Sequence, residues 1–182
     1  MPGDIRPTQN IVRKAVFDIL GQDMSGIKFL ELFAGSGSVG LEALSRGAAE
    51  VVFVESNSKC VEVLEKNLSL LGLSPEIREE GTEVMEADAI PMIKTLSQEG
   101  KKFDIVFLDP PFGLDLAKKA LNQLSAYDIL HANCIVVVQT QKKEDLPPEL
   151  GRLRQFKERI YGLSLLRFYQ ITGQDASEGE SA

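Results

Sequence analysis

The sequence predicts an α/β protein with a mostly parallel sheet, helices on both faces of the sheet and an antiparallel hairpin at the C-terminal end. Three observations support this fold. Short apolar segments alternate with amphipathic segments of helical spacing over most of the 182 residues. A glycine-rich turn follows the first apolar strand-like segment, and a single glycine, Gly162, separates the last two. The alternation favours right-handed crossovers between parallel strands, whereas the short last connection requires an antiparallel pair.

A helix is expected first, at residues 8–20, where apolar side chains recur at helical spacing. Thr8 can cap this helix and Gly21 can end it. Residues 142–150 are mostly polar, and Pro147 and Pro148 exclude a helix there. The remaining pattern predicts strands at 28–33, 51–55, 82–86, 103–108, 134–139, 156–161 and 163–171, and helices at 39–46, 57–71, 90–96 and 116–124.

The composition excludes several classes of function. The longest apolar run, residues 134–138, is too short to cross a membrane. Cys60 and Cys134 stand apart, which predicts reduced thiols and a cytoplasmic protein. Because His131 is the only histidine, neither a metal site nor a Ser-His-Asp triad is expected. The net charge of −7 argues mildly against nucleic-acid binding, although basic residues gather near the N-terminus and within residues 152–159.

A glycine-rich turn at residues 31–40 predicts a site for a nucleoside-containing cofactor. Its glycines allow positive φ and a close approach of the backbone to a ligand, and the helix that follows directs its first N–H groups toward the same point. Glu55 ends the next strand, about twenty residues further on, where a carboxylate can bind ribose hydroxyls. The expected cofactor-binding residues are Glu31, Phe33, Ala34, Gly35, Ser36, Gly37, Gly40, Glu55, Ser56, Asp88 and Ala89.

The segment Asp109, Pro110, Pro111, Phe112 supplies the candidate catalytic residues. Two prolines remove two backbone donors, so this turn offers carbonyl oxygens and a carboxylate to a substrate that brings N–H groups. The Asp109 carboxylate and the Pro110 carbonyl can each accept one N–H of an amino group, and Phe112 can stack on a base. We expect Gly35, Glu55, Asp88 and Asp109 to meet at the carboxyl ends of parallel strands.

This combination favours methyl transfer from S-adenosylmethionine to an amino group. We expect the adenosine to lie along residues 35–40 with its ribose on Glu55. Asp88 and Ala89 would then lie along the edge of the adenine ring, and Glu31 would lie near the methionine part of the cofactor. The positive charge of the sulfonium disappears as the methyl group moves, so this reaction needs no metal.

Several segments resemble the bacterial small-subunit rRNA guanine-N2 methyltransferases, the RsmD family. The glycine turn and the Asp-Pro-Pro-Phe motif are shared with other amino-group methyltransferases, whereas the segments near Arg6 and Ser45 are typical of this family. The resemblance extends from about Arg6 to Gln170. It is carried by residues 6–8 (RPT), 13–17 (RKAVF), 32–37 (LFAGSG), 40–48 (GLEALSRGA) and 109–112 (DPPF).

The resemblance implies methylation of a guanine N2 amino group in the 16S rRNA of the assembled small ribosomal subunit. It also implies a seven-stranded, Rossmann-like class I methyltransferase sheet, and RNA contacts at Arg6, Thr8 and Arg13. We expect residues 1–22 to form a helix that covers the cofactor and contacts RNA, 23–172 the methyltransferase domain, and 173–182 a disordered acidic tail. Family members usually carry a basic, glycine-containing segment before the RPT motif, and five residues precede Arg6 here, so weaker docking on rRNA is expected if that segment contributes.

The residues alone leave other functions open. A methyltransferase acting on adenine N6 in DNA or on a protein glutamine uses a similar acceptor rim. A nicotinamide-dependent oxidoreductase shares the glycine turn, but no second domain that would bring a substrate to a nicotinamide is expected here. A non-catalytic RNA-binding module would bind rRNA without turnover. The oligomeric state cannot be predicted from the sequence.

Overall fold

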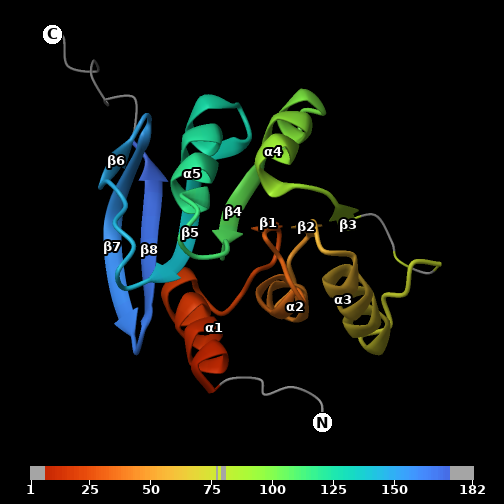
Figure 1. Ribbon diagram of the computed structural model, residues 1–182. Coiled ribbons are helices and arrows are strands. Elements are labelled where there is room, and N and C mark those ends of the chain that lie inside the picture. The colour runs from red at the N-terminus through yellow and green to blue at the C-terminus, as the bar shows by residue number, and fades with distance from the viewer. Residues whose placement is uncertain (1–6, 77, 79–80, 173–182) are drawn as a thin grey trace, which may run out of the picture.

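The computed structural model describes residues 7–76, 78 and 81–172, with the side chains of Pro7 and Thr8 left aside (Figure 1). Arg6 and the predicted tail at 173–182 therefore lie outside the described residues. None of the described helices has the length and apolar character needed to cross a membrane.

One sheet organises the molecule, with the strand order β3-β2-β1-β4-β5-β8-β7-β6. The first five strands in this order pair in parallel, and β8, β7 and β6 pair antiparallel to their neighbours. The predicted α/β fold with its C-terminal hairpin is confirmed. The strands are β1 (Lys28–Leu32), β2 (Glu50–Glu55), β3 (Thr82–Glu86), β4 (Phe103–Leu108), β5 (Leu130–Gln141), β6 (Glu149–Leu150), β7 (Leu153–Tyr161) and β8 (Ser164–Ile171).

The sheet has eight strands, so the expected number of seven is wrong by one. The additional strand, β6, contains two residues and pairs at the sheet edge with the start of β7. It exists because Leu150 is buried and Gly151, at φ 57°, turns the chain tightly into β7. A strand of two residues is too short to show a periodic pattern in the sequence.

Helices cover both faces of the sheet (Figure 1). On one face lie α1 (Pro7–Leu20), α2 (Ser38–Ser45) and α3 (Ser58–Leu70), and on the other lie α4 (Ala89–Gln98) and α5 (Leu116–Ala126). Because successive strand residues point to opposite faces, β1 contributes Phe29 to the core beneath α1, α2 and α3, and Leu30 to the core beneath α4 and α5. The parallel strands are therefore apolar on both faces, as a covered sheet requires.

Helix α1 is part of the core. Its residues Val12, Val16 and Phe17 are almost fully buried, in the same cluster as Leu166 and Phe168 of β8. These contacts fix α1 between α2 and the C-terminal strands, so α1 belongs to the core on this face of the sheet.

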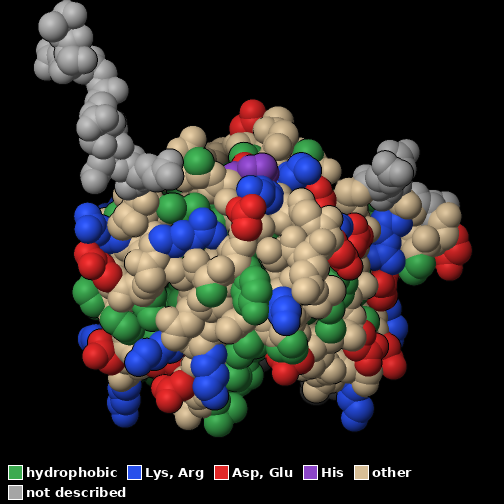
Figure 2. All heavy atoms as spheres, turned by 90° about the horizontal axis from the view of Figure 1, so that it is seen from above, with side chains coloured by type: hydrophobic (Ala, Val, Ile, Leu, Met, Phe, Trp, Pro, Cys, Tyr) green, Lys and Arg blue, Asp and Glu red, His purple; other side chains and the backbone are tan. Residues whose placement is uncertain are grey.

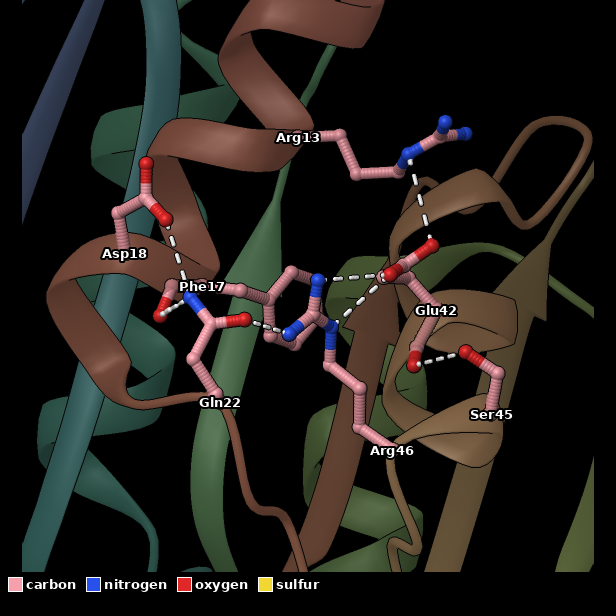
Figure 3. A network of polar contacts seen from close by, with 7 residues as sticks. All are labelled: Arg13, Phe17, Asp18, Gln22, Glu42, Ser45 and Arg46. Carbon is pink, nitrogen blue, oxygen red and sulfur yellow. Dashed lines mark hydrogen bonds and ion pairs between the residues drawn. The ribbon is translucent and has the colours of Figure 1, made fainter.

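Polar contacts also join α1 to α2 (Figure 3). The Arg46 guanidinium lies over the Phe17 ring, 4.8 Å from its centroid, and donates through Nε and Nη2 to Glu42 Oε1 at 2.9 Å. It also donates to Gln22 Oε1. One arginine thus connects the end of α2 to both α1 and the segment that follows it.

Candidate active site

The carboxyl ends of four parallel strands lie side by side at one edge of the sheet. In the register, Leu32 of β1 pairs with Leu108 of β4, so Asp109 follows β4 next to the start of the glycine turn. On the other side, the N–H of Ala87 donates to the Glu55 carbonyl at 3.0 Å. The structure therefore brings the turn, Glu55 and Asp109 together, as the order of strands predicts.

The glycine turn has an unusual backbone. Phe33, Gly35 and Gly37 have positive φ values of 55°, 57° and 78°. For a bulky residue such as Phe33 this conformation is strained, and such strain gathers at functional sites. The turn is held by hydrogen bonds from Ala34 N–H to the Val54 carbonyl (3.0 Å) and from Gly37 N–H to the Ala34 carbonyl (2.8 Å).

The three glycines serve different purposes. A Cβ atom added to Gly37 would lie 2.2 Å from Leu64 Cδ1, and one added to Gly40 would lie 2.4 Å from Phe53 Cε1. These two glycines let the turn and α2 pack closely on β2 and α3. A Cβ at Gly35 would meet nothing within 4 Å, so this glycine borders open space into which a ligand can fit.

Glu55 holds the turn and the start of α3 together. Its Oε2 accepts the Gly35 N–H at 2.7 Å, and its Oε1 accepts the Asn57 N–H at 2.8 Å. A carboxylate oxygen can accept a second donor, so hydroxyls of a ligand can bind here without displacing the backbone.

Glu31 is a buried carboxyl below the turn, with 3% of its surface exposed. Its Oε2 accepts the Gly40 N–H at 2.7 Å, which ties β1 to the first turn of α2. Burial raises the pKa of Glu31 to about 8 against the effect of the N–H groups of Gly40 and Val39, and the negative charges of Asp109 and Glu55 act in the same direction as burial. Among the described residues, no lysine or arginine forms an ion pair with any of these three carboxyls.

Asp109 follows β4 directly and is partly buried. Burial raises the pKa of its carboxyl to about 7. Within the described part of the chain, no side chain or backbone N–H donates a hydrogen bond to it, so its oxygens are available to a ligand. Pro110 is buried and fixes the turn, whereas Phe112 is 46% exposed and presents its ring to solvent.

Comparison with known proteins identifies the family. Residues 2–170 match the family described as Conserved hypothetical protein 95. The chain is 37% identical to the Haemophilus influenzae protein named Ribosomal RNA small subunit methyltransferase D, over 91% of the chain and 83% of that relative. It is 31% identical to the Escherichia coli protein of the same name, over 98% of the chain and 85% of the relative. The chain belongs to this family of methyltransferases, the RsmD family.

Solved structures agree with this assignment. The chain superposes on a methyltransferase from Escherichia coli, yhhF, with a TM-score of 0.79 and 31% identity, covering 95% of the chain and 91% of that structure. It also shares its fold with a Thermus thermophilus 16S rRNA N2 G1207 methyltransferase, solved with AdoMet and guanosine. For that pair the TM-score is 0.73 at 23% identity, over 94% of the chain and 44% of that structure.

In this RsmD-family member, the structure shows a structural role for the two residues expected beside a cofactor adenine. Asp88 caps α4 by accepting the Ile90 N–H at 3.1 Å, and Ala89 is buried in the first turn of that helix. Ser36 and Ser56 are exposed.

Two polar residues of the site have no signal in the sequence motifs. Asn67 of α3 donates from Nδ2 to the Ser36 carbonyl at 3.2 Å and so supports the glycine turn from below. Asn57 caps α3 by accepting the Lys59 N–H at 3.0 Å. The type of residue at position 57 could have suggested a cap, but the contact of Asn67 depends on packing between distant segments.

The expected RNA contacts are only partly described. Arg6 and the Thr8 side chain lie outside the described part, and α1 begins at Pro7, one residue before the expected cap. Arg13 points toward α2, where its Nε lies 3.8 Å from Glu42 Oε2 (Figure 3).

Proposed function

We propose that this protein transfers a methyl group from S-adenosylmethionine to the exocyclic N2 amino group of a guanine in the 16S rRNA of the small ribosomal subunit. The observation that carries the proposal is the position of Asp109. An unpaired carboxyl next to two prolines and an exposed phenylalanine stands beside a glycine turn that borders open space. The names of the relatives support an rRNA substrate.

The site is chemically suited to the proposed cofactor. Glu31, Glu55 and Asp109 place three carboxyl groups close together without a described basic partner, and a ligand that brings positive charge would favour their ionised forms. S-adenosylmethionine supplies a methyl group on a positively charged sulfur, which takes the electron pair of the broken carbon–sulfur bond. We assign its binding to residues 33–37 and Gly40, Glu31, Glu55, Ser56, Asp88 and Ala89.

Asp109 and Pro110 would orient the amino group. Each can accept one N–H, which leaves the nitrogen lone pair directed at the methyl carbon, and Phe112 would stack on the guanine. As the new nitrogen–carbon bond forms, the nitrogen becomes positive and must lose a proton. A carboxylate with a pKa of about 7 can accept that proton near neutral pH.

The proposal also assigns roles to the remaining parts of the chain. We assign residues 23–172 to the methyltransferase domain and residues 1–22 to a segment that covers the cofactor and contacts RNA through Arg6, Thr8 and Arg13. An enzyme that modifies ribosomal RNA would act in the cytoplasm, and the free thiols of Cys60 and Cys134, both within the described part, are compatible with that location.

The test is transfer of labelled methyl groups to four substrates in parallel: small ribosomal subunits, protein-free 16S rRNA, duplex DNA and release factors. We expect label in 16S rRNA, at a guanine that carries the methyl group on N2 after digestion to nucleosides. Label only in DNA or protein would contradict the proposal and favour the other amino-group methyltransferases. Binding of NAD but not S-adenosylhomocysteine, measured by calorimetry, would favour an oxidoreductase.

A further inference from the structure

A groove lies between α1 and β7 and is not part of the cofactor site. It is a hollow of ≈ 360 Å³ lined by Ile11, Lys14 and Asp18 of α1 and by Arg159 and Tyr161 of β7, among others. We name it the α1/β7 groove. Lys157 extends it, because Lys157 and Arg159 pair with Phe168 and Leu166, which belong to the core on the α1 side of the sheet.

The cations of this groove lack carboxylate partners. Within the described part of the chain, no carboxylate oxygen lies within 4.0 Å of the side-chain nitrogens of Lys14, Lys157 or Arg159. The Arg159 guanidinium donates only to the neighbouring Glu158 carbonyl, at 2.8 Å. The one acid of the groove, Asp18, accepts a hydrogen bond from Gln22 at 3.0 Å. The groove is therefore locally basic on a chain of net charge −7.

A second hollow, at the opposite edge of the sheet, differs from the α1/β7 groove in the pairing of its cations. There, a hollow lined by residues that include His131 also contains three lysines. Each of them pairs with a carboxylate: Lys28 with Glu50, Lys101 with Glu50 and Glu83, and Lys102 with Asp128. In Figure 2, blue and red side chains stand next to one another around the purple histidine. The basic groups on that edge are neutralised within the protein.

The α1/β7 groove opens toward the catalytic edge. Strand β7 runs in the same direction as β4 and β5, because β8 is antiparallel to both β5 and β7. Arg159 and Tyr161 therefore lie near the carboxyl ends of the parallel strands. Helix α1 runs in the same direction as α2, since Arg13 meets Glu42 and Phe17 meets Arg46 further along. The first half of α1, which contains Ile11 and Lys14, thus lies toward the same edge.

We propose that the α1/β7 groove binds the sugar-phosphate backbone of the RNA substrate, next to the guanine held at Asp109. This inference rests on the proposed function. Cations without internal partners gain most from phosphate contacts, because no ion pair must be broken and the counterions of RNA are released. Exposed apolar groups beside them, Ile11 at 56% and Leu163 of the β7–β8 turn at 82%, can pack on ribose and bases.

The test compares two double variants of the full chain with equal charge change. The groove variant is Lys14→Glu with Arg159→Glu. The control is Lys66→Glu with Lys94→Glu, which changes exposed lysines of α3 and α4 that have no described ion pair. Binding to protein-free 16S rRNA and to small subunits is measured over a range of salt concentrations. Melting temperature and affinity for S-adenosylhomocysteine verify that both variants are folded.

We expect the groove variant to bind 16S rRNA at least about tenfold more weakly than the control. The slope of the logarithm of the binding constant against the logarithm of the salt concentration should be less steep by about 1.4, the value for two lost contacts to single-stranded RNA. Equal RNA affinity of the two variants would overturn the assignment of the groove to RNA binding. Methylation of rRNA by the wild type, and hence the proposed function, would be unaffected by that result. Weaker binding to subunits but unchanged binding to 16S rRNA would assign the groove to a ribosomal protein instead. Failure of the wild type to bind or methylate rRNA would overturn both proposals.

Discussion

At the scale of single residues, the proposed chemistry depends on Asp109. Only its deprotonated form can take up a proton from the amino group, and burial raises its pKa to about 7. The fraction of active enzyme must therefore rise with pH. We expect kcat/KM to increase through about pH 7 and to level off above it. Asp109→Asn should lower turnover by about a hundredfold or more and remove this pH dependence, while affinity for S-adenosylhomocysteine persists.

The matched control is Asp128→Asn, which removes an exposed carboxylate that pairs with Lys102 at the other edge of the sheet. Its turnover and pH profile should equal those of the wild type. A wild-type profile that is flat between pH 6 and 8, or near-normal turnover of Asp109→Asn, would contradict the assigned role.

At the scale of elements, two glycines of the turn differ: Gly40 is closely packed, and Gly35 borders the open space assigned to the proposed cofactor. Gly40→Ala would place a methyl group 2.4 Å from Phe53 Cε1 and 2.7 Å from Glu31 Oε2, so α2 must shift and the Glu31–Gly40 hydrogen bond must weaken. We expect a loss of stability of about 1–3 kcal/mol, measured by urea unfolding. Gly35→Ala should cost about 1 kcal/mol for its positive φ, yet reduce affinity for S-adenosylhomocysteine. A smaller loss of stability for Gly40→Ala than for Gly35→Ala would contradict this division.

The connection between α1 and α2 gives a second prediction at this scale. Arg46→Ala removes the contact with Phe17 and the hydrogen bonds to Glu42 and Gln22. We expect a loss of about 1–2 kcal/mol in urea unfolding, because these groups are partly buried. Arg154→Ala, which breaks the exposed pair with Glu149, should change stability by less than about 0.5 kcal/mol. Equal losses of stability for the two substitutions would show that the α1–α2 connection contributes no more to stability than an exposed ion pair.

The glycine turn also shows what a sequence can and cannot reveal. Its place was predictable, because glycine spacing between a strand and a helix reflects a local backbone requirement. The separate purposes of Gly35 and Gly40 were not, because they depend on Phe53 of another strand and on open space. The strained Phe33 is likewise invisible, since its side chain gives no hint of a positive φ.

At the scale of the whole molecule, the parallel sheet and the clustering of basic residues along the chain could be anticipated, whereas the pairing of individual charges could not. Apolar strands alternating with amphipathic helices predict a parallel sheet with its site at the carboxyl ends of the strands, and the observed strand order brings Glu31, Glu55 and Asp109 to one edge. Whether a lysine is neutralised depends on which distant carboxylate packs beside it. Lys101 finds Glu50 and Glu83 across the sheet, whereas Lys14 has no such partner within the described part. Net charge alone therefore conceals the basic groove.

Global stability should depend on pH through Glu31. Its ordinary pKa is 4.5 and burial raises the folded-state value to about 8, so the folded protein holds a proton that the unfolded chain has released between these values. Stability must therefore fall as pH rises through this range, by about 1.4 kcal/mol per pH unit where only this group differs. We expect Glu31 to lower the free energy of unfolding by about 2.5 kcal/mol between pH 6 and 8.5. Glu31→Gln, which keeps an acceptor for the Gly40 N–H but carries no charge, should reduce this decrease, whereas Glu62→Gln on the exposed face of α3 should not. A pH dependence that is the same in all three proteins would mean that the Glu31 carboxyl is ionised in the folded state at neutral pH.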